Sequence, residues 1–485
     1  MFDAQRITPK IAGILTLFVI FIIYFVTLPP DILPGDSAEF QALIPVGGVL
    51  HPSGYPLYQL LGKIEIVIIP FGTIAWRITL LSAIFATATA GVGMILFNKS
   101  GVSPVLSTLG GVTLALTPML WRQAVIAEVY TLAVLLLFLL WLAGYQYYHH
   151  RIKLEWLALL SGLAASHHLI LVAALPWPFF ALLKRSNDLK ARRILGAVIL
   201  FLAPFSLYGL ILLHARKWMA VFPGETFGFP DAVVRGYISP FWLAGLFKFI
   251  TGGSYTSSSS ALWQVNAIDL PAILRQWAVW ITANYSILGG ILALLGVVWL
   301  YKHHRFLLLL TFPTFLIIAL FSGHYMMVYH EDTGFLFIAI MSVSVWIVFG
   351  LQAIWERVDG NLRLIPILLV LSLVVWEIMT FHQQPSYWPE QQNSSVSPRT
   401  WATTSLTAAA PDSIIFGGWG YITPLRYMQF VEHLRPDVMV VHAPLGDHDF
   451  MKQLTAETDQ IGKKAYFLIP NPEKGVILTP AEEAP

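Results

Sequence analysis

The sequence predicts a mainly α-helical, polytopic membrane protein that ends in a small α/β domain. Of its 485 residues, 56% are hydrophobic and only 12% are charged, and the mean hydropathy is +0.68. A soluble domain carries about 25% charged residues. Long apolar runs alternate with polar segments up to residue 380, and short apolar runs alternate with turns after it. This pattern excludes a purely soluble enzyme and a disordered chain.

The charge balance and the absence of cysteine exclude several classes of function. The formal net charge is +2, from 29 Lys and Arg against 27 Asp and Glu, without the basic stripe that nucleic-acid binding needs. A chain without cysteine has no disulfides, thiolate nucleophiles, iron–sulfur clusters or cysteine zinc sites. We therefore expect no nucleic-acid partner, and any metal would need His or carboxylate ligands.

The membrane domain is predicted to contain about eleven helices. A helix of about 20 residues crosses a hydrocarbon core of roughly 30 Å. The first apolar run, 11–28, is not followed by a small-residue cleavage site, so we expect an uncleaved helix rather than a signal peptide. The stretch 155–183 has basic segments at both ends, which predicts that it enters and returns with a turn near Ser166, His167 and His168. The predicted spans are 11–28, 75–97, 102–120, 124–148, 155–168, 169–183, 195–213, 272–300, 306–322, 334–355 and 362–380.

Basic residues predict the orientation of these helices. The clusters of Lys and Arg near 6–10, 99, 151–153, 184–193, 302–305 and 357–363 all fall on one side of the predicted spans, and such clusters mark the cytoplasmic side. The N-terminus is expected to be cytoplasmic and the C-terminal domain extracytoplasmic, at the plasma membrane in a prokaryote. The stretches expected outside are 29–74, 214–271, 322–333 and everything after 380.

Two domains are predicted, a membrane domain over 1–380 and an extracytoplasmic α/β domain over 381–485. In the second domain, short buried runs are typical of strands and the amphipathic stretch between them is typical of a helix. The expected strands are Ser413–Phe416, Val438–His442 and Ala465–Ile469, and the expected helix is Thr423–Leu434.

The first outer segment carries two carboxylates, Asp36 and Glu39, followed by His51, Tyr55 and Tyr58 in a loop rich in Pro and Gly. Carboxylates three residues apart lie on one face of a helix, and the aromatic loop is expected to fold over them. A desolvated carboxylate at this position can serve as a general base. The alternative is that the two acids cap and solvate a short interfacial helix.

Glu128 is expected about one turn inside an apolar helix, near its outer end. An unpaired carboxylate in lipid is costly, so ionisable groups in a membrane usually face the interior of a bundle. The alternative to a catalytic or binding role is a structural ion pair with Arg122 or Arg77.

Other polar residues of the outer side are candidates for substrate binding. His167 and His168 diverge by about 100° if they are helical, which disfavours joint metal ligation and leaves hydrogen bonding or simple packing. His330 and Asp332 lie in a cluster that a charged turn explains equally well. Cations suited to a phosphate are Arg77, Arg122, Arg216, Lys217 and Arg235.

The candidate residues of the outer side lie in motifs that follow one another along the chain in a specific order and spacing. Together the motifs resemble those of the membrane glycosyltransferases related to transmembrane protein 260, and Pro424–Val438 is similar to the extracytoplasmic domain of that family. The motifs are Gly-Asp-Ser-x-Glu-Phe at 35–40, His-Pro-x-Gly-Tyr-Pro-Leu-Tyr at 51–58, Trp-Arg-Ile-x-Leu-Leu-Ser-Ala at 76–83, Ala-Glu-Val-Tyr-x-Leu at 127–132 and Gly-Leu-x-x-Ser-His-His at 162–168.

The resemblance implies a glycosyltransferase C fold with an acidic catalytic residue in the first outer loop. Such enzymes take a sugar from a polyprenyl-phosphate carrier, and the animal relatives are protein O-mannosyltransferases of the secretory lumen. It therefore implies the inverting transfer of a hexose, most directly mannose, to a Ser or Thr hydroxyl of an extracytoplasmic protein, or to a glycan. No metal and no cofactor is expected besides the lipid-linked donor.

The resemblance also assigns roles. Asp36 would be the general base, Glu128 a second catalytic carboxylate that orients hydroxyls, and an arginine would stabilise the departing phosphate. The residues expected to bind substrate are Glu39, His51, Tyr55, Tyr58, Arg77, Arg122, Tyr130, His167, His168, Arg216, His330 and Asp332.

The chain departs from the family pattern at one turn of the tail, which limits the role that the resemblance can assign to this domain. Many relatives carry an acidic residue in the Gly-rich turn after the first tail strand, whereas this chain has Gly417-Gly418-Trp419-Gly420. We therefore predict acceptor binding or packing for the tail, and no catalytic or metal site there. The alternative functions are a transporter or flippase of a lipid-linked sugar, which would leave its substrate unchanged, and a membrane scaffold that docks partners through the tail.

Overall fold

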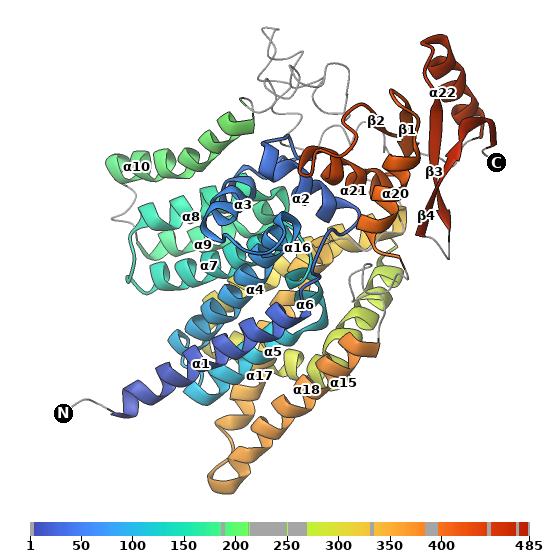
Figure 1. Ribbon diagram of the computed structural model, residues 1–485. Helices are drawn as coiled ribbons and strands as arrows, with labels where there is room; N and C mark the ends of the chain where they lie inside the picture. Colours follow the sequence, from blue (N-terminus) through green and yellow to red (C-terminus); the bar gives the residue numbers. More distant parts are fainter. Residues whose placement is uncertain are drawn as a thin grey trace.

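The computed structural model of the protein describes residues 4–185, 190–211, 213, 250, 269–329, 334–383, 396–443, 448–471 and 475–483. A bundle of helices fills most of the molecule, and a small sheet with three helices lies at one end of it (Figure 1). This arrangement confirms the predicted class, a mainly helical membrane protein with a small C-terminal α/β unit.

Eight helices of the described residues are long and apolar enough to cross a membrane, or nine if one bent pair counts as a single span. The helices of the bundle that pass this test singly are α1 (Ala4–Thr27), α4 (Ile74–Lys99), α7 (Tyr130–Tyr148), α10 (Ala191–Leu202) with the 3-10 turn η4 (Ala203–Leu207) that follows it, α15 (Leu270–His303), α16 (Arg305–Tyr329), α17 (Gly334–Trp355), and α18 (Leu364–Gln383) with the 3-10 turn η7 (Gly360–Arg363) before it.

Among the described residues, nine of the eleven predicted spans pass this test if the bent pair counts as one, and the stretch 155–183 holds the two that are shorter. The run 102–120 forms two helices, α5 (Pro104–Leu116) and α6 (Pro118–Ala124), which bend by 66°. The stretch 155–183 forms α8 (Leu154–His167) and then only short pieces, because proline lacks the N–H that a longer helix needs. These pieces are η1 (Leu169–Ala174), α9 (Pro176–Phe179) and η2 (Phe180–Lys184). The turn does fall at His168, as predicted.

Helix α17 forms the centre of the bundle, because its residues are buried continuously from Leu336 to Ala353. It crosses α15 at very short range. A Cβ atom added to Gly296 of α15 would lie 1.8 Å from the carbonyl oxygen of Trp346, and one added to Gly350 would lie 2.0 Å from that of Leu292. The backbones of α15 and α17 therefore touch at these two glycines, as small residues permit in membrane helices.

Two further helices, α2 (Asp36–Val46) and α3 (Pro56–Ile68), follow α1 and lie at the same end of the bundle as the sheet (Figure 1). Neither passes the test for a span. The expected outer segment 29–74 is therefore largely helical, and it forms the surface that the tail contacts.

The tail contains a four-stranded sheet with the order β2-β1-β3-β4. Strand β1 pairs in parallel with β2 and β3, and β4 is antiparallel to β3. The three predicted strands and the predicted helix are present, shifted by up to four residues, whereas β4 and two helices were not predicted. The elements are α20 (Pro398–Ala408), β1 (Ile414–Gly417), α21 (Trp419–Phe430), β2 (Met439–His442), α22 (His448–Gln460), β3 (Ala465–Asn471), β4 (Gly475–Pro480) and the turn η9 (Ala481–Glu483).

The tail is docked on the segment that contains α2. Side chains of α20 and α21 share one apolar core with Ile32, Ala38, Ala42 and Ala75, and Figure 1 shows α21 beside α2. Two polar contacts add to this core. Arg399 forms a two-pronged ion pair with Asp31, and the backbone N–H of Ala75 donates to the Tyr427 hydroxyl at 3.2 Å. The docked tail brings the start of α21 to the start of α2.

Candidate active site

Asp36 is the first residue of α2, and the residue before it explains how the helix starts there. Gly35 adopts φ 67° and ψ −142°, a conformation that a residue with a side chain rarely adopts. A carboxylate in the first turn interacts favourably with the positive end of the helix dipole. Its Oδ1 accepts a hydrogen bond from the indole Nε1–H of Trp419 at 2.6 Å. No described residue donates a hydrogen bond to Oδ2, which leaves that oxygen available to a substrate.

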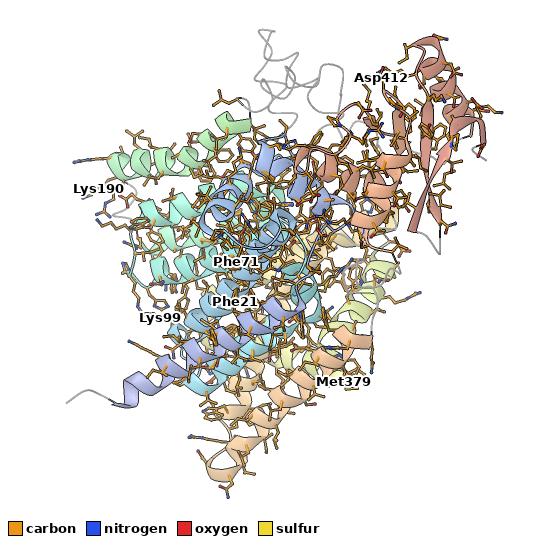
Figure 2. The ribbon with its side chains drawn as sticks, in the orientation of Figure 1. Phe21, Phe71, Lys99, Lys190, Met379 and Asp412 are labelled. Atoms are coloured by element: carbon orange, nitrogen blue, oxygen red, sulfur yellow. The ribbon has the colours of Figure 1, made fainter. Side chains whose placement is uncertain are left out.

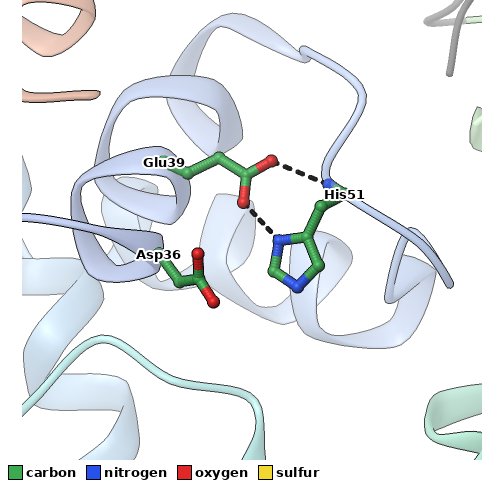
Figure 3. Close-up of side chains that lie close together, drawn as sticks. All are labelled: Asp36, Glu39 and His51. Carbon is green, nitrogen blue, oxygen red and sulfur yellow. Dashed lines mark hydrogen bonds and ion pairs between the residues drawn. The ribbon is translucent and has the colours of Figure 1, made fainter. Parts of the chain in front are cut away.

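Glu39 points in a different direction and is bound by His51. Its side chain is only 3% exposed, one oxygen accepts the backbone N–H of His51 at 2.7 Å, and the other contacts the ring Nδ1. Figure 3 shows the Glu39 carboxylate directed at His51, with the Asp36 carboxylate beside the imidazole ring. Burial lowers the pKa of His51, but the Glu39 and Asp36 carboxylates outweigh it and raise the pKa to about 10. Burial also raises the pKa of Glu39, so Glu39 and His51 act as a coupled pair joined by this contact. Buried in this way, Glu39 does not solvate a surface helix.

Aromatic rings connect this acidic cluster to the rest of the predicted site. The Phe40 ring lies 5.5 Å from the rings of both His51 and Tyr58. The Tyr55 ring lies 5.2 Å from that of His51 and 5.7 Å from that of His168. The aromatic loop thus folds over the two acids, as the sequence predicted. Further ring contacts link Tyr55 with His167 at 6.2 Å and Tyr130 with His168 at 5.4 Å.

Glu128 lies in the loop before α7 rather than one turn inside a helix, which corrects the prediction. The backbone N–H and C=O of Glu128 both bond to the Ser82 hydroxyl at 3.3 Å, so a side chain satisfies groups that a helix would otherwise pair. Neither Arg77 nor Arg122 forms an ion pair with it among the described residues, which removes the structural alternative. Burial, followed by repulsion from Asp36, raises the pKa of Glu128 to about 8.

The two histidines at the end of α8 present opposite hydrogen-bonding groups. The Nε2 of His167 lies 3.0 Å from the carbonyl oxygen of Val129, so Nε2 carries the proton and Nδ1 is an acceptor in the neutral ring. The Nδ1 of His168 accepts the N–H of Ile170 at 3.2 Å, so its Nε2 is a donor. His167 Nδ1 and His168 Nε2 are both buried and have no partner in the part of the chain that the structure describes. A buried polar atom normally has a partner, so both atoms are suited to a ligand.

The predicted phosphate-binding cations differ in the contacts that the structure gives them. Arg77 donates to the carbonyl oxygens of Ile66, Phe71 and Gly72 at 2.9 to 3.1 Å, which favours a structural role at the end of α3 over phosphate binding. The guanidinium of Arg122, at the end of α6, makes no hydrogen bond or ion pair with any other described residue. Three other predicted cations, Arg216, Lys217 and Arg235, lie outside the described residues, and so do the substrate-binding candidates His330 and Asp332.

Asp36, Glu39 and His51 are the residues that could hold a metal ion in the described part of the chain. One ligand atom from each lies within 4.8 Å of the others, and oxygen and imidazole ligands suit several divalent metals. However, both Glu39 oxygens are bonded to His51, and Asp36 Oδ1 is bonded to Trp419. A metal ligated by Glu39 would have to compete with His51, whereas Asp36 could offer its Oδ2.

Three contact residues of the site were not predicted. Trp419 reaches it from the tail, Phe335 of α17 packs 5.7 Å from the His168 ring, and Ser82 of α4 holds the Glu128 backbone. Ser82 belongs to a motif that was recognised, so the motif itself was a signal. Nothing in the sequence near Trp419 or Phe335 connects them to a carboxylate or a histidine far away in the chain.

The segment that builds this site matches a known family. Residues 36–191 match the model described as the protein O-mannosyl-transferase TMEM260 N-terminal domain. The resemblance to the TMEM260 family is confirmed. The match includes Asp36, Glu39, His51, Glu128 and the two histidines, whereas Trp419 and Phe335 lie beyond it.

Two relatives extend the comparison. The protein is 27% identical over 307 residues to the protein O-mannosyl-transferase TMEM260 of Mus musculus, covering 58% of this chain and 41% of the mouse protein. It is 26% identical over 198 residues to the tmem260 protein of Dictyostelium discoideum, covering 37% of this chain and 24% of that relative. The chain therefore matches less than half the length of either relative.

Solved structures support the fold. The ArnT protein of Cupriavidus metallidurans in the apo state superposes with a TM-score of 0.51 at 11% identity, covering 94% of this chain and 92% of ArnT. The same protein bound to undecaprenyl phosphate gives a TM-score of 0.53 at 11% identity, with 96% and 97% covered. This likeness confirms the expected glycosyltransferase C-type fold.

Proposed function

We propose that the protein is a membrane glycosyltransferase that moves a hexose, most directly mannose, from a polyprenyl-phosphate carrier to a hydroxyl acceptor. The observation that carries the proposal is the position of Asp36. Its carboxylate is fixed at a helix start, has one oxygen available, and lies in the segment that matches the family. The printed names of the two relatives support mannose and a protein acceptor. The fold shared with a protein that binds undecaprenyl phosphate supports a lipid-linked donor.

In the proposed reaction Asp36 acts as general base. Its carboxylate takes the proton of the acceptor hydroxyl as the oxygen attacks the anomeric carbon of the donor. A new C–O bond forms on one face of the sugar while the bond to the phosphate oxygen breaks on the other face, so the configuration inverts. The bonding electrons leave with the phosphate, which gains one negative charge.

The departing phosphate needs a positive charge nearby, since stabilising a charge that develops in the transition state contributes strongly to catalysis. Arg122 fits this role best among the described cations, because its guanidinium has no partner there. Arg216 remains a candidate on sequence alone. Neither step requires a metal ion or a cofactor.

The neutral groups around Asp36 fit the recognition of a sugar. The His168 Nε2–H would donate to an oxygen of the donor, and the His167 Nδ1 would accept from a sugar hydroxyl. Glu128 adds an acceptor that is protonated more readily than an exposed carboxylate. The rings of Tyr55 and Tyr130 both contact that of His168 and would form part of the wall of the sugar site.

The proposal includes a division into a membrane domain, 1–380, and a domain outside the membrane, 381–485, with the N-terminus on the cytoplasmic side. Figure 2 supports this orientation, because the basic residues Lys99 and Lys190 lie away from Asp412 of the tail. Positive residues mark the cytoplasmic side. The site at the start of α2 would then face outward, where secreted and surface proteins are available as acceptors.

The test is a transfer assay with radiolabelled mannose on polyprenyl phosphate, using purified wild type, Asp36→Asn, and Asp359→Asn as a matched control. Asp359 is exposed and pairs with Arg363, away from the site. We expect label to enter protein with wild type and with Asp359→Asn. A general base accelerates a reaction by about 100- to 10,000-fold. We therefore expect the transfer rate of Asp36→Asn to fall by at least about 100-fold. Full activity of Asp36→Asn would contradict the role of the base.

A flippase would behave differently in the same preparation. In proteoliposomes it would move the intact donor between leaflets without releasing polyprenyl phosphate. That result, with no label in protein or glycan, would replace the transferase proposal with transport of a lipid-linked sugar.

A further inference from the structure

The contact between Trp419 and Asp36 joins the last part of the chain to the candidate base. Trp419 is the first residue of α21, directly after β1 and the pair Gly417-Gly418. Its indole Nε1–H donates to Asp36 Oδ1 at 2.6 Å. In a general-base mechanism, the direction in which the base presents its second oxygen decides whether it can reach the acceptor proton.

We propose that Trp419 is the positioning residue of the active site, supplied by the C-terminal unit to hold Asp36 in its reactive orientation. This inference rests on the proposed function of Asp36 as general base. An indole N–H can donate a hydrogen bond but cannot accept one or exchange a proton in this pH range. Trp419 therefore orients the base and takes no part in proton transfer.

The neighbours of Asp36 explain why its carboxylate must be kept in one orientation. The His51 ring lies close to the Asp36 carboxylate, within the group whose ligand atoms are all within 4.8 Å. A carboxylate that could turn freely would be able to bond to this ring through the oxygen that must accept the proton. Glu39 contacts the Nδ1 of His51 and the indole holds Asp36 Oδ1, so Oδ2 stays available.

The tail holds the indole itself in place. The Trp419 ring lies edge-on to the ring of His442, at the end of β2, with 5.7 Å between centroids. The helix that starts at Trp419 is buried against α2 through Ile422 and Leu425. The ion pair of Arg399 with Asp31 and the bond from Ala75 to Tyr427 fix the tail on both sides of this contact. The position of the indole is thus set by the docked tail as a whole.

The direction of the sheet agrees with this role. Strand β1 runs parallel with β2 and β3, and Trp419 follows its carboxyl end. In parallel α/β sheets the carboxyl ends of the strands form the edge at which functional residues collect. Here that edge faces Asp36, so the tail would contribute a residue to the centre itself and not only a surface for the acceptor.

Three variants of the full-length protein test the inference. Trp419→Phe keeps an aromatic ring but removes the donor. Replacing Trp419 with benzothienylalanine, in which sulfur substitutes for the N–H group, keeps the shape of the indole and removes only the donor. Trp401→Phe is the control, because Trp401 is buried in the same apolar core and does not contact Asp36.

We expect both changes at Trp419 to lower kcat by about tenfold to a hundredfold, as misplacing a reacting group does. KM for donor and acceptor should stay within about twofold, because the substrates keep their own contacts. Trp401→Phe should keep the wild-type kcat. The melting temperature of the benzothienylalanine protein should equal that of wild type, which separates orientation from folding.

A wild-type kcat in the benzothienylalanine protein would overturn the inference, and so would a change confined to KM, which would indicate substrate binding by the ring. In either case an inactive Asp36→Asn would leave the proposed function intact. An active Asp36→Asn would instead contradict the proposed function, whatever the Trp419 variants do. The two failures are therefore distinguishable in one set of assays.

Discussion

At the scale of single residues, the two histidines at the end of α8 would make the proposed site selective. A backbone carbonyl and a backbone N–H fix which nitrogen of each ring carries the proton. A ligand that bonds to both free nitrogens would have to offer an acceptor to His168 and a donor to His167. A sugar hydroxyl satisfies both demands, and a phosphate oxygen satisfies only the first.

We predict that His168→Phe raises KM for the lipid-linked donor by about fivefold, since one hydrogen bond to a ligand is worth roughly 1 kcal/mol, and more if the ligand is charged. His168→Gln should recover part of this loss, because its amide N–H can donate. Steady-state kinetics with varied donor check the effect. A rise in the acceptor KM alone would move His168 to the acceptor side of the site, and unchanged constants would remove it from substrate binding.

Metal removal tests the cluster of Asp36, Glu39 and His51. Because both Glu39 oxygens are bonded to His51 and Asp36 Oδ1 is bonded to Trp419, three of the four carboxylate oxygens of the cluster are already occupied, and we predict full activity after dialysis against EDTA. The measurement is mannose transfer before and after chelation, with added Mg²⁺ or Mn²⁺ as the reverse control. Loss of activity that either ion restores would contradict the prediction and would make these three residues its ligands.

The sequence predicted most residues of the site but not all of their surroundings. Asp36, Glu39, His51, Tyr55 and the His167 pair stood out because polar residues are rare in this chain. Their proximity follows from α2 and the aromatic loop, which are close in sequence. Trp419 is 383 residues from Asp36, and the contact depends on how the tail docks, which no local pattern encodes.

At the scale of elements, α15 and α17 cross with their backbones in contact at Gly296 and Gly350. We predict that Gly296→Ala destabilises the protein by about 1 to 3 kcal/mol, because the added methyl group would force the two backbones apart. Gly290→Ala in the same helix is the control, since its added Cβ would meet only Ile281 at 3.7 Å. Thermal unfolding in detergent measures both. Equal melting temperatures would show that the helices can shift to accept the methyl group.

Elements were predictable where composition alone decides them. Long apolar runs predicted eight spans closely, and short buried runs predicted three strands of the tail. The prediction was wrong where side chains compete with the backbone. At Glu128 the Ser82 hydroxyl takes the groups that would have extended α7 toward its N-terminus, and nothing in the apolar stretch 124–148 signals this.

At the scale of the whole molecule, the bundle and the tail form one assembly through α2. An apolar core, the ion pair of Arg399 with Asp31 and two further hydrogen bonds join them. Hydrophobic patterning predicted both parts, since each buries its own core. Hydrophobic patterning could not predict the interface between the two parts. The residues of α2 that face the tail are small and few, and the same residues would also be compatible with a surface that faces lipid headgroups.

The order in which a ribosome makes the chain determines when the contact between Trp419 and Asp36 can form. The helices that would receive the lipid-linked sugar enter the membrane first, and Trp419 is made after them. Until the tail has folded onto α2, the carboxylate exists but is not held. A copy whose tail has not docked would therefore hydrolyse little of the lipid-linked donor, and docking of the tail would itself switch the enzyme on.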